Sequence, residues 1–225
     1  MPFEIKPASD HTLLVTFGES IAEQHQREVW ALTRKLLARP TLFVRNVHPA
    51  YNSILIDFDL ALVTMQQAAK HVHTLAASLA HEPQLEARRL EIPVCYEEPF
   101  GPDLQDVAAH CKLTVDAVIA LHTRASYQVC FIGFTPGFGY LRGLAPQLFT
   151  PRLPTPRTSV PAGSVAIGGE QTAIYPLSTP GGWRIIGRTP LQMFDAERAE
   201  ASLLAPGDEV RFIAISREEF DDRGV

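Results

Sequence analysis

The segment from Ala117 to Phe194 carries six arginines but only one carboxylate, Glu170, and no lysine. The arginines are Arg124, Arg142, Arg152, Arg157, Arg184 and Arg188. Arginine presents a planar fork of N–H donors that can hold a carboxylate or phosphate with two hydrogen bonds, whereas lysine is a flexible point charge. Because the whole chain has a formal charge of -5, this local excess of arginine suggests recognition of an anion.

Two interpretations of the arginines stay open. They either pair with acids elsewhere, such as Glu97 or Asp195, and face water, or they line a cleft for an anionic ligand. Two glycine pairs, Gly168-Gly169 and Gly181-Gly182, favour the cleft. Glycine allows backbone N–H groups to approach a ligand closely.

Motifs for other chemistries are missing from the sequence. None of the four lysines follows a glycine, so there is no GxxxxGK[ST] phosphate loop. There is also no HExxH zinc motif and no GxSxG nucleophile motif. The mild acidity argues against a nucleic-acid partner, and no apolar run approaches the roughly 20 residues of a membrane span. We therefore expect no metal site, no nucleic-acid binding and no membrane segment.

The cysteines indicate the compartment. Cys95, Cys111 and Cys130 are odd in number and lack CxxC or metal-ligand spacing. The N-terminal residues MPFEIKPASD lack the basic start and apolar core of a signal peptide. The sequence thus predicts a cytoplasmic protein with reduced thiols.

The elements of the first part, residues 1–85, predict a small α+β domain. Apolar runs predict strands, and a three-to-four-residue apolar spacing predicts two helices. Thr64 with Gln67 matches a capping box at the start of the second helix. The expected order is Phe3–Lys6, Thr12–Phe17, helix Ile21–Ala38, Phe43–Val47, Ser53–Phe58 and a helix after Thr64. An antiparallel sheet with helices on one face follows from that order.

The second part, residues 86–225, predicts a β-barrel. Ten of the 14 glycines lie between Gly133 and Gly187, and nine of the 18 prolines lie between Pro136 and Pro190. Both residue types disfavour helix interiors, so this region is built of short strands and turns. Two short helices precede it, with Asp103 and Thr114 as expected N-caps. The expected strands are Arg88–Tyr96, Tyr127–Ile132, Ser164–Ile167, Thr172–Tyr175, Arg184–Gly187 and Glu209–Ile215. A further exposed helix is expected over DAERAEA, residues 195–201.

Three long stretches carry a family resemblance: YQVCFIGFTPGFGYLRGL, TPRTSVPAGSVAIGGEQTAIYPLSTPGGWRIIGRTP and LLAPGDEVRFIAISREEF. Together with HPAYNSILIDFD and IPVCYEEPFGPDL they resemble the family that contains the B subunit of 5-oxoprolinase, allophanate hydrolase subunit 1 and KipI-type kinase inhibitors. The resemblance runs over essentially the whole chain. It implies a small N-terminal α+β domain followed by a cyclophilin-like β-barrel.

The resemblance implies three activities. The first is that of the B subunit of an ATP-dependent 5-oxoprolinase, which opens 5-oxoproline to L-glutamate with the A and C subunits and is inactive alone. The second is the equivalent carboxyltransferase or allophanate hydrolase-type subunit of urea metabolism. The third is inhibition of histidine-kinase autophosphorylation. A free-standing chain of this size favours the first, with ATP used by the complex and not located on this chain.

The matching motifs contain the expected site residues. For the anion we expect Arg157 and Arg188. For polar contacts we expect Gln171 and Tyr175, and for the pocket wall Phe134, Gly182 and Trp183, although Trp183, Tyr175 and Gln171 also suit barrel packing. His122 is the only histidine close in sequence: it either caps or packs the second short helix or is the candidate for proton transfer. No nucleophile is identified.

Overall fold

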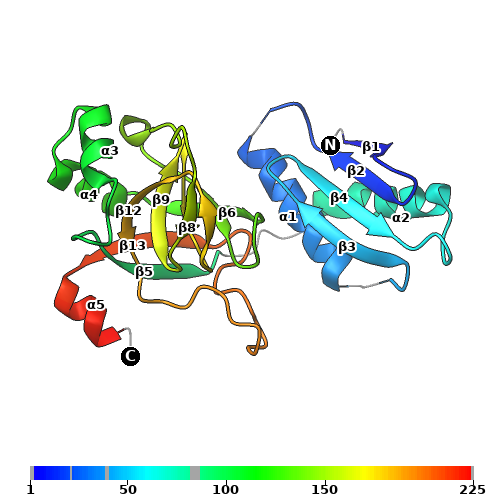
Figure 1. The fold of residues 1–225 in the computed structure, drawn as a ribbon. Helices are drawn as coiled ribbons and strands as arrows, with labels where there is room; N and C mark the ends of the chain where they lie inside the picture. Colours follow the sequence, from blue (N-terminus) through cyan, green and yellow to red (C-terminus); the bar gives the residue numbers. More distant parts are fainter. Residues whose placement is uncertain (1–2, 21, 39–40, 82–86, 224–225) are drawn as a thin grey trace. The chain divides into compact units, whose positions relative to one another are not determined.

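The computed structural model describes residues 3–20, 22–38, 41–81 and 87–223, arranged in two compact units, Met1–Glu86 and Ala87–Val225 (Figure 1). Each unit has its own apolar core. The predicted boundary between residues 85 and 86 falls outside the described residues.

The first unit is an antiparallel sheet in the order β1-β2-β4-β3. Its strands are β1 (Glu4–Pro7), β2 (Thr12–Thr16), β3 (Val44–Pro49) and β4 (Ser53–Phe58). In β4, Ile54, Ile56 and Phe58 are buried while the residues between them are partly exposed. This two-residue alternation turns one face of the sheet to the core.

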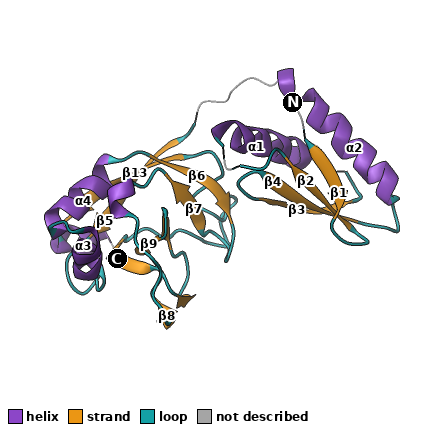
Figure 2. Ribbon diagram, turned by 90° about the horizontal axis from the view of Figure 1, so that it is seen from above, coloured by secondary structure: helices purple, strands orange, loops and turns teal. Residues whose placement is uncertain are grey.

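Two helices cover that core face, α1 (Glu23–Ala38) and α2 (Met65–Ala77), followed by the 3-10 turn η1 (Ser78–His81). Figure 2 shows both helices on the same side of the sheet. Val29, Leu32 and Leu36 of α1 are buried, at the spacing of one helix face. At the start of α2, the Thr64 side chain and Gln67 form the predicted capping box.

The second unit is a closed barrel in the strand order β10-β7-β6-β13-β5-β12-β9. The barrel strands are β5 (Arg89–Cys95), β6 (Tyr127–Ile132), β7 (Gly139–Arg142), β9 (Ser164–Gly168), β10 (Gln171–Ile174), β12 (Arg184–Arg188) and β13 (Glu209–Ile215). Strands β5 and β13 pair in parallel, from Arg89↔Glu209 to Cys95↔Ile215, and β9 pairs with β10 to close the ring. A separate two-stranded ribbon joins β8 (Arg157–Val160) to β11 (Thr179–Gly181).

Short helices complete the second unit: α3 (Leu104–Cys111), α4 (Val115–Arg124), η2 (Pro146–Leu148) and α5 (Arg217–Arg223). Helix α3 contacts β12, and α4 contacts β13. Their apolar sides join the main core, in which Val94, Val129 and Phe212 are fully buried. Thr114 accepts the Ala117 N–H as the predicted cap of α4.

The predicted fold class, an α+β unit followed by a cyclophilin-like barrel, is confirmed. Two local predictions need correction. Asp103 occupies the predicted N-cap position of α3, but its side chain makes no capping hydrogen bond. Residues 195–201 form turns in place of a helix, because the Asp195 carboxylate accepts the Glu197 N–H and an isolated bridge joins Phe194 to Ser202.

Candidate functional site

An aromatic cluster covers part of the barrel's outer surface. Phe138, Tyr175 and Trp183 are buried, and Tyr140 packs against them. The Phe138 ring lies edge-on to Tyr175 at 5.2 Å and to Trp183 at 5.8 Å, and Tyr140 meets Trp183 at 6.0 Å between centroids. Edge-to-face pairs at these distances are favourable. We call these four residues the outer aromatic cluster.

Glycines allow the rings to approach the backbone. A Cβ on Gly168 would lie 2.4 Å from the Trp183 ring, and one on Gly181 would lie 2.3 Å from the Tyr175 hydroxyl oxygen. One glycine of each pair, Gly168 and Gly181, therefore leaves room for the ring of Trp183 or Tyr175, because a side chain there would collide with the ring. Gly182 has only ordinary contacts, and its carbonyl accepts the Leu153 N–H at 2.7 Å.

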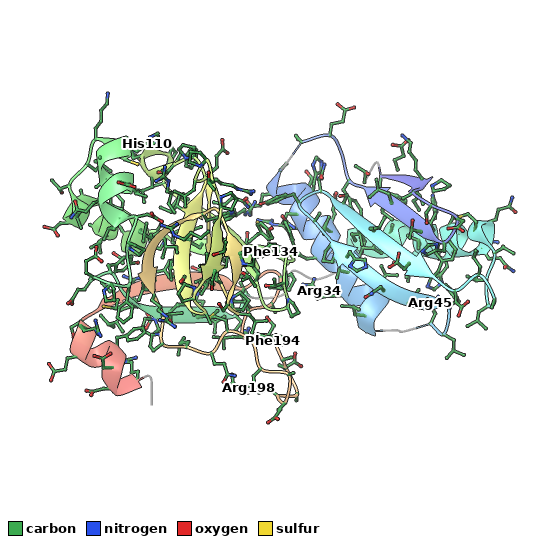
Figure 3. All side chains as sticks on the ribbon, viewed as in Figure 1. Arg34, Arg45, His110, Phe134, Phe194 and Arg198 are labelled. Atoms are coloured by element: carbon green, nitrogen blue, oxygen red, sulfur yellow. The ribbon has the colours of Figure 1, made fainter. Side chains whose placement is uncertain are left out.

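Phe134 projects from the loop between β6 and β7 (Figure 3). Its φ is 63° and it is 60% exposed. Hydrogen bonds within the loop hold this strained backbone, since Gly133 N–H donates to Phe138 and Phe138 N–H to Thr135. The Phe134 ring meets Phe138 at 5.3 Å, at the rim of the outer aromatic cluster.

Gln171 begins β10, where its register partner is Gly168. The next residue, Thr172, turns inward to His122, so Gln171 points outward on the face that carries the outer aromatic cluster. Its side-chain nitrogen Nε2 is buried without a hydrogen-bond partner among the described residues. The structure thus places Gln171, Tyr175, Trp183 and Phe134 on one side of the barrel.

The predicted anion-binding arginines have different partners. Arg157 donates from Nη2 to Oδ1 of Asp103 at 2.7 Å, while its Nη1 is buried and has no partner among the described residues. Arg188 donates from Nε to the Ala162 carbonyl at 2.9 Å, and its guanidinium lies 5.9 Å from the Phe100 ring centroid.

The other arginines have separate environments. Arg184 pairs with Asp106 at 3.1 Å, and Arg142 donates to Gln128. Arg152 lies over the Trp183 ring, 5.5 Å from its centroid. The acids that serve Arg157 and Arg184 therefore come from the region of α3, whereas the sequence had suggested Glu97 or Asp195.

His122 lies inside the barrel with 0% exposure. Its Nδ1 is 2.7 Å from the Tyr96 hydroxyl and its Nε2 is 3.0 Å from the Thr172 hydroxyl, which donates to the Ala166 carbonyl. The bonds are consistent with a neutral ring that accepts from Tyr96 and donates to Thr172. Burial lowers the pKa of His122 to about 3. This arrangement holds the ring by two hydrogen bonds inside the barrel, away from solvent.

Two of the three cysteines, Cys95 and Cys130, are buried and lack the environment of a nucleophile. Burial raises the pKa of the Cys130 thiol to about 11 and raises that of Cys95 as well. A reactive thiol needs a lowered pKa and access to solvent. Among the described residues, no group of three or more His, Cys, Asp or Glu side chains could hold a metal ion. No helix in the same part of the chain has the length and apolar character needed to span a membrane.

Sequence reasoning missed Asp103, Tyr140 and Arg152 as parts of this region. Asp103 was assigned to a helix cap, yet its carboxylate bridges Arg157 and the Ile185 N–H. Tyr140 stands in the quoted GFGYL motif, and Arg152 is one of the six arginines, so both carried a signal. Neither the motif nor the arginine count singled out Tyr140 or Arg152, because the contact of each residue with Trp183 depends on tertiary packing.

Comparisons with known proteins show what most of the chain is similar to. The family model for the carboxyltransferase domain, subdomain C and D, matches residues 3–204. The B subunit of 5-oxoprolinase from Bacillus subtilis (strain 168) is 36% identical over 228 residues, covering 97% of this chain and 95% of the relative. The protein of the same name from Escherichia coli O157:H7 is 46% identical over 192 residues, covering 84% and 85%.

Several solved structures are also similar to this chain in sequence and fold. TTHA0988 is 38% identical with a TM-score of 0.82 over 91% of this chain, and the chain spans only 40% of the length of TTHA0988. PH0987 from Pyrococcus horikoshii is 39% identical, with a TM-score of 0.58 over 96% of this chain and 100% of that protein. The K. lactis urea amidolyase, at 20% identity and a TM-score of 0.76, supports the fold alone.

Proposed function

The chain belongs to the family of carboxyltransferase-domain proteins that includes the B subunit of 5-oxoprolinase, and from this membership we propose that it is the B subunit of an ATP-dependent 5-oxoprolinase. It opens 5-oxoproline to L-glutamate together with the A and C subunits and is inactive alone. The observation that carries the proposal is 36% identity to a relative of that name over 95% of the relative's length.

5-Oxoproline is a lactam that carries a carboxylate. Opening an unactivated amide needs coupling to ATP, and the negative charge that develops on the lactam oxygen must be stabilised. Preorganised donors in a site that excludes water each contribute about 3 kcal/mol to such stabilisation. On this chain we assign polar contacts to Gln171 and Tyr175, and the apolar wall to Phe134, Trp183 and Gly182.

The two arginines first expected to bind the anion enter this proposal with different roles. Arg157 keeps one buried donor, Nη1, beyond its bond to Asp103. Arg188 has no carboxylate partner among the described residues and remains a candidate for a second anionic group. His122 is not assigned to proton transfer, because it is fully buried.

The described residues do not fit a phosphate-loop nucleotide site. Gly168 ends strand β9 and Gly169 leads to strand β10, while Gly181 ends β11 and Gly182 leads to β12. A phosphate loop instead needs glycines that lead into a helix N-terminus. We therefore assign ATP to another member of the complex. The C subunit is the expected direct partner, and in TTHA0988 a matching segment is part of a longer chain.

A carboxyltransferase role is the second candidate, favoured by the description of the matching family model. Co-expression of the full chain with homologues of the A and C subunits from the same genome separates the two. We expect co-elution of all the partners needed for activity and ATP-dependent release of glutamate by the assembled complex only. Robust turnover by the lone chain, or an assembled complex that transfers carboxyl groups and leaves 5-oxoproline intact, contradicts the proposal.

A further inference from the structure

The indole of Trp183 is enclosed on two sides. One side rests on Gly168, where a Cβ would come within 2.4 Å of the ring. The guanidinium of Arg152 lies over the ring with its central carbon 5.5 Å from the centroid, within the range of a cation–π contact. Trp183 therefore holds the Arg152 head group at a fixed place on the outer face of the barrel.

Arg152 keeps its hydrogen-bonding capacity in this position. Among the described residues it has no carboxylate partner, in contrast to Arg157 and Arg184. A guanidinium that contacts a ring through its face still presents N–H donors in its plane. Those donors match the two oxygens of a carboxylate.

Two further groups lie beside Trp183. Gln171 is paired in register with Gly168, and its buried Nε2 lacks a partner among the described residues. Tyr140 meets the Trp183 ring at 6.0 Å. The charge of Arg152 also opposes the rise that burial causes in the pKa of Tyr140. An unpaired buried amide is suited to a polar atom of a ligand.

We propose that Arg152, Gln171 and Tyr140 form a binding site for a small carboxylate that carries a neighbouring amide. Arg152 holds the carboxylate, and Gln171 and Tyr140 contact the amide. The site deepens the proposed function, on which its assignment to 5-oxoproline rests. It places the substrate carboxylate on Arg152, a residue outside the set expected from the sequence.

The test is an NMR titration of the full-length, ¹⁵N-labelled chain. The chain has two tryptophans, so the indole N–H of Trp30 in the first unit is an internal control for that of Trp183. The probes are 5-oxoproline, N-acetylglycine and 2-pyrrolidone, which lacks the carboxylate. We expect saturable shifts of Trp183 with the two carboxylates, none with 2-pyrrolidone, and none of Trp30.

Two variants test the site, and a third is the control. Arg152→Lys keeps the charge and is expected to weaken binding about tenfold, because the two-donor geometry is lost. Gln171→Met keeps the volume and removes the amide, and a similar loss is expected. Arg198→Lys is the control, since Arg198 is exposed and paired with Asp195 at 3.0 Å, and affinity should not change. Circular dichroism checks that each variant is folded.

The outcomes separate this site from the proposed function. No saturable shift with either carboxylate, or equal affinity in Arg152→Lys, overturns the site even if the assembled complex opens 5-oxoproline. Arg152-dependent binding of N-acetylglycine without binding of 5-oxoproline supports the site and contradicts the proposed substrate. Arg152-dependent binding of both supports the site and its assignment.

Discussion

Arg157 and Asp103 lie 54 residues apart in the chain and form a hydrogen-bonded ion pair at 2.7 Å. The other oxygen of the same carboxylate accepts the backbone N–H of Ile185 at 2.7 Å. One nearly buried carboxylate thus ties β8 and β12 to the segment that enters α3. Arg157, expected from the sequence to bind a ligand, is therefore also a structural link.

Asp103→Asn should lower the free energy of unfolding of the second unit by about 2 kcal/mol, since it weakens two hydrogen bonds to a charged group. Asp106→Asn is the matched control, because Asp106 also pairs with an arginine but its side chain is 67% exposed. An exposed pair contributes at most about 1 kcal/mol. Urea denaturation measures both variants, and equal losses would contradict the assignment.

Arg157→Lys tests the remaining donor of that arginine. Lysine can keep the charge opposite Asp103 but cannot hold a second donor in the fixed geometry of Nη1. In the assembled complex we expect kcat/KM for 5-oxoproline to fall about tenfold, equal to about 1.4 kcal/mol. Urea denaturation should show a smaller loss of stability than in Asp103→Asn. Unchanged kcat/KM would leave Arg157 with its structural role alone.

His122 should make stability depend on pH. Its pKa is about 3 in the folded chain and about 6.5 when unfolded. Between these values the unfolded state binds the additional proton, so stability is fully present above pH 6.5 and decreases as the pH falls towards 3, by up to about 1.4 kcal/mol per pH unit. His122→Gln should unfold with a shallower pH dependence. If stability depended on pH equally in the unsubstituted chain and in His122→Gln, a buried neutral His122 ring would be ruled out.

Gly168→Ala should displace Trp183, because the added Cβ would meet its ring at 2.4 Å. We expect a loss of about 2 kcal/mol from overpacking and a change in tryptophan fluorescence. Gly182→Ala is the control, since its nearest contact is an ordinary 3.6 Å. If Gly168→Ala matched the control in both measurements, the close approach of the Trp183 ring to Gly168 would be contradicted.

Thr64→Ala removes the capping box of α2 and should cost the first unit about 1 kcal/mol. Thr74→Ala, on the same helix, removes only a hydroxyl that donates to the Lys70 carbonyl. Such back-bonding stabilises a helix little, and alanine has the better helix propensity. Thermal unfolding should therefore separate the two variants, and a larger loss from Thr74→Ala would contradict the cap.

Local patterns were sufficient for much of the fold. Strand β4 and the cap at Thr64 depend on neighbours within a few residues, so alternation and capping rules place them correctly. Strands β7, β8 and β11 escaped prediction because they are three or four residues long and contain glycine or proline, or lie beside them. Their pairing with distant strands decides their conformation.

The candidate site was only partly predictable for the same reason. Tyr175 and Trp183 stand in long motifs, and the structure places both in the outer aromatic cluster. The bond between Arg157 and Asp103 joins residues far apart in the chain, and no local pattern encodes it. His122 shows the converse, since nearness in sequence to the motifs did not bring it to the surface.

The parallel pairing of β5 with β13 has a consequence for biosynthesis. Arg89 of β5 pairs with Glu209, which is made 120 residues later, so the barrel cannot close before then. On the ribosome, β5 emerges with both edges unpaired, whereas the sheet of the first unit is complete once Phe58 has been made. Long-range pairing of this kind is slow, and open strand edges invite aggregation. We therefore expect the first unit to fold during translation before the barrel can close, so that nascent chains stalled within the second unit depend on chaperones.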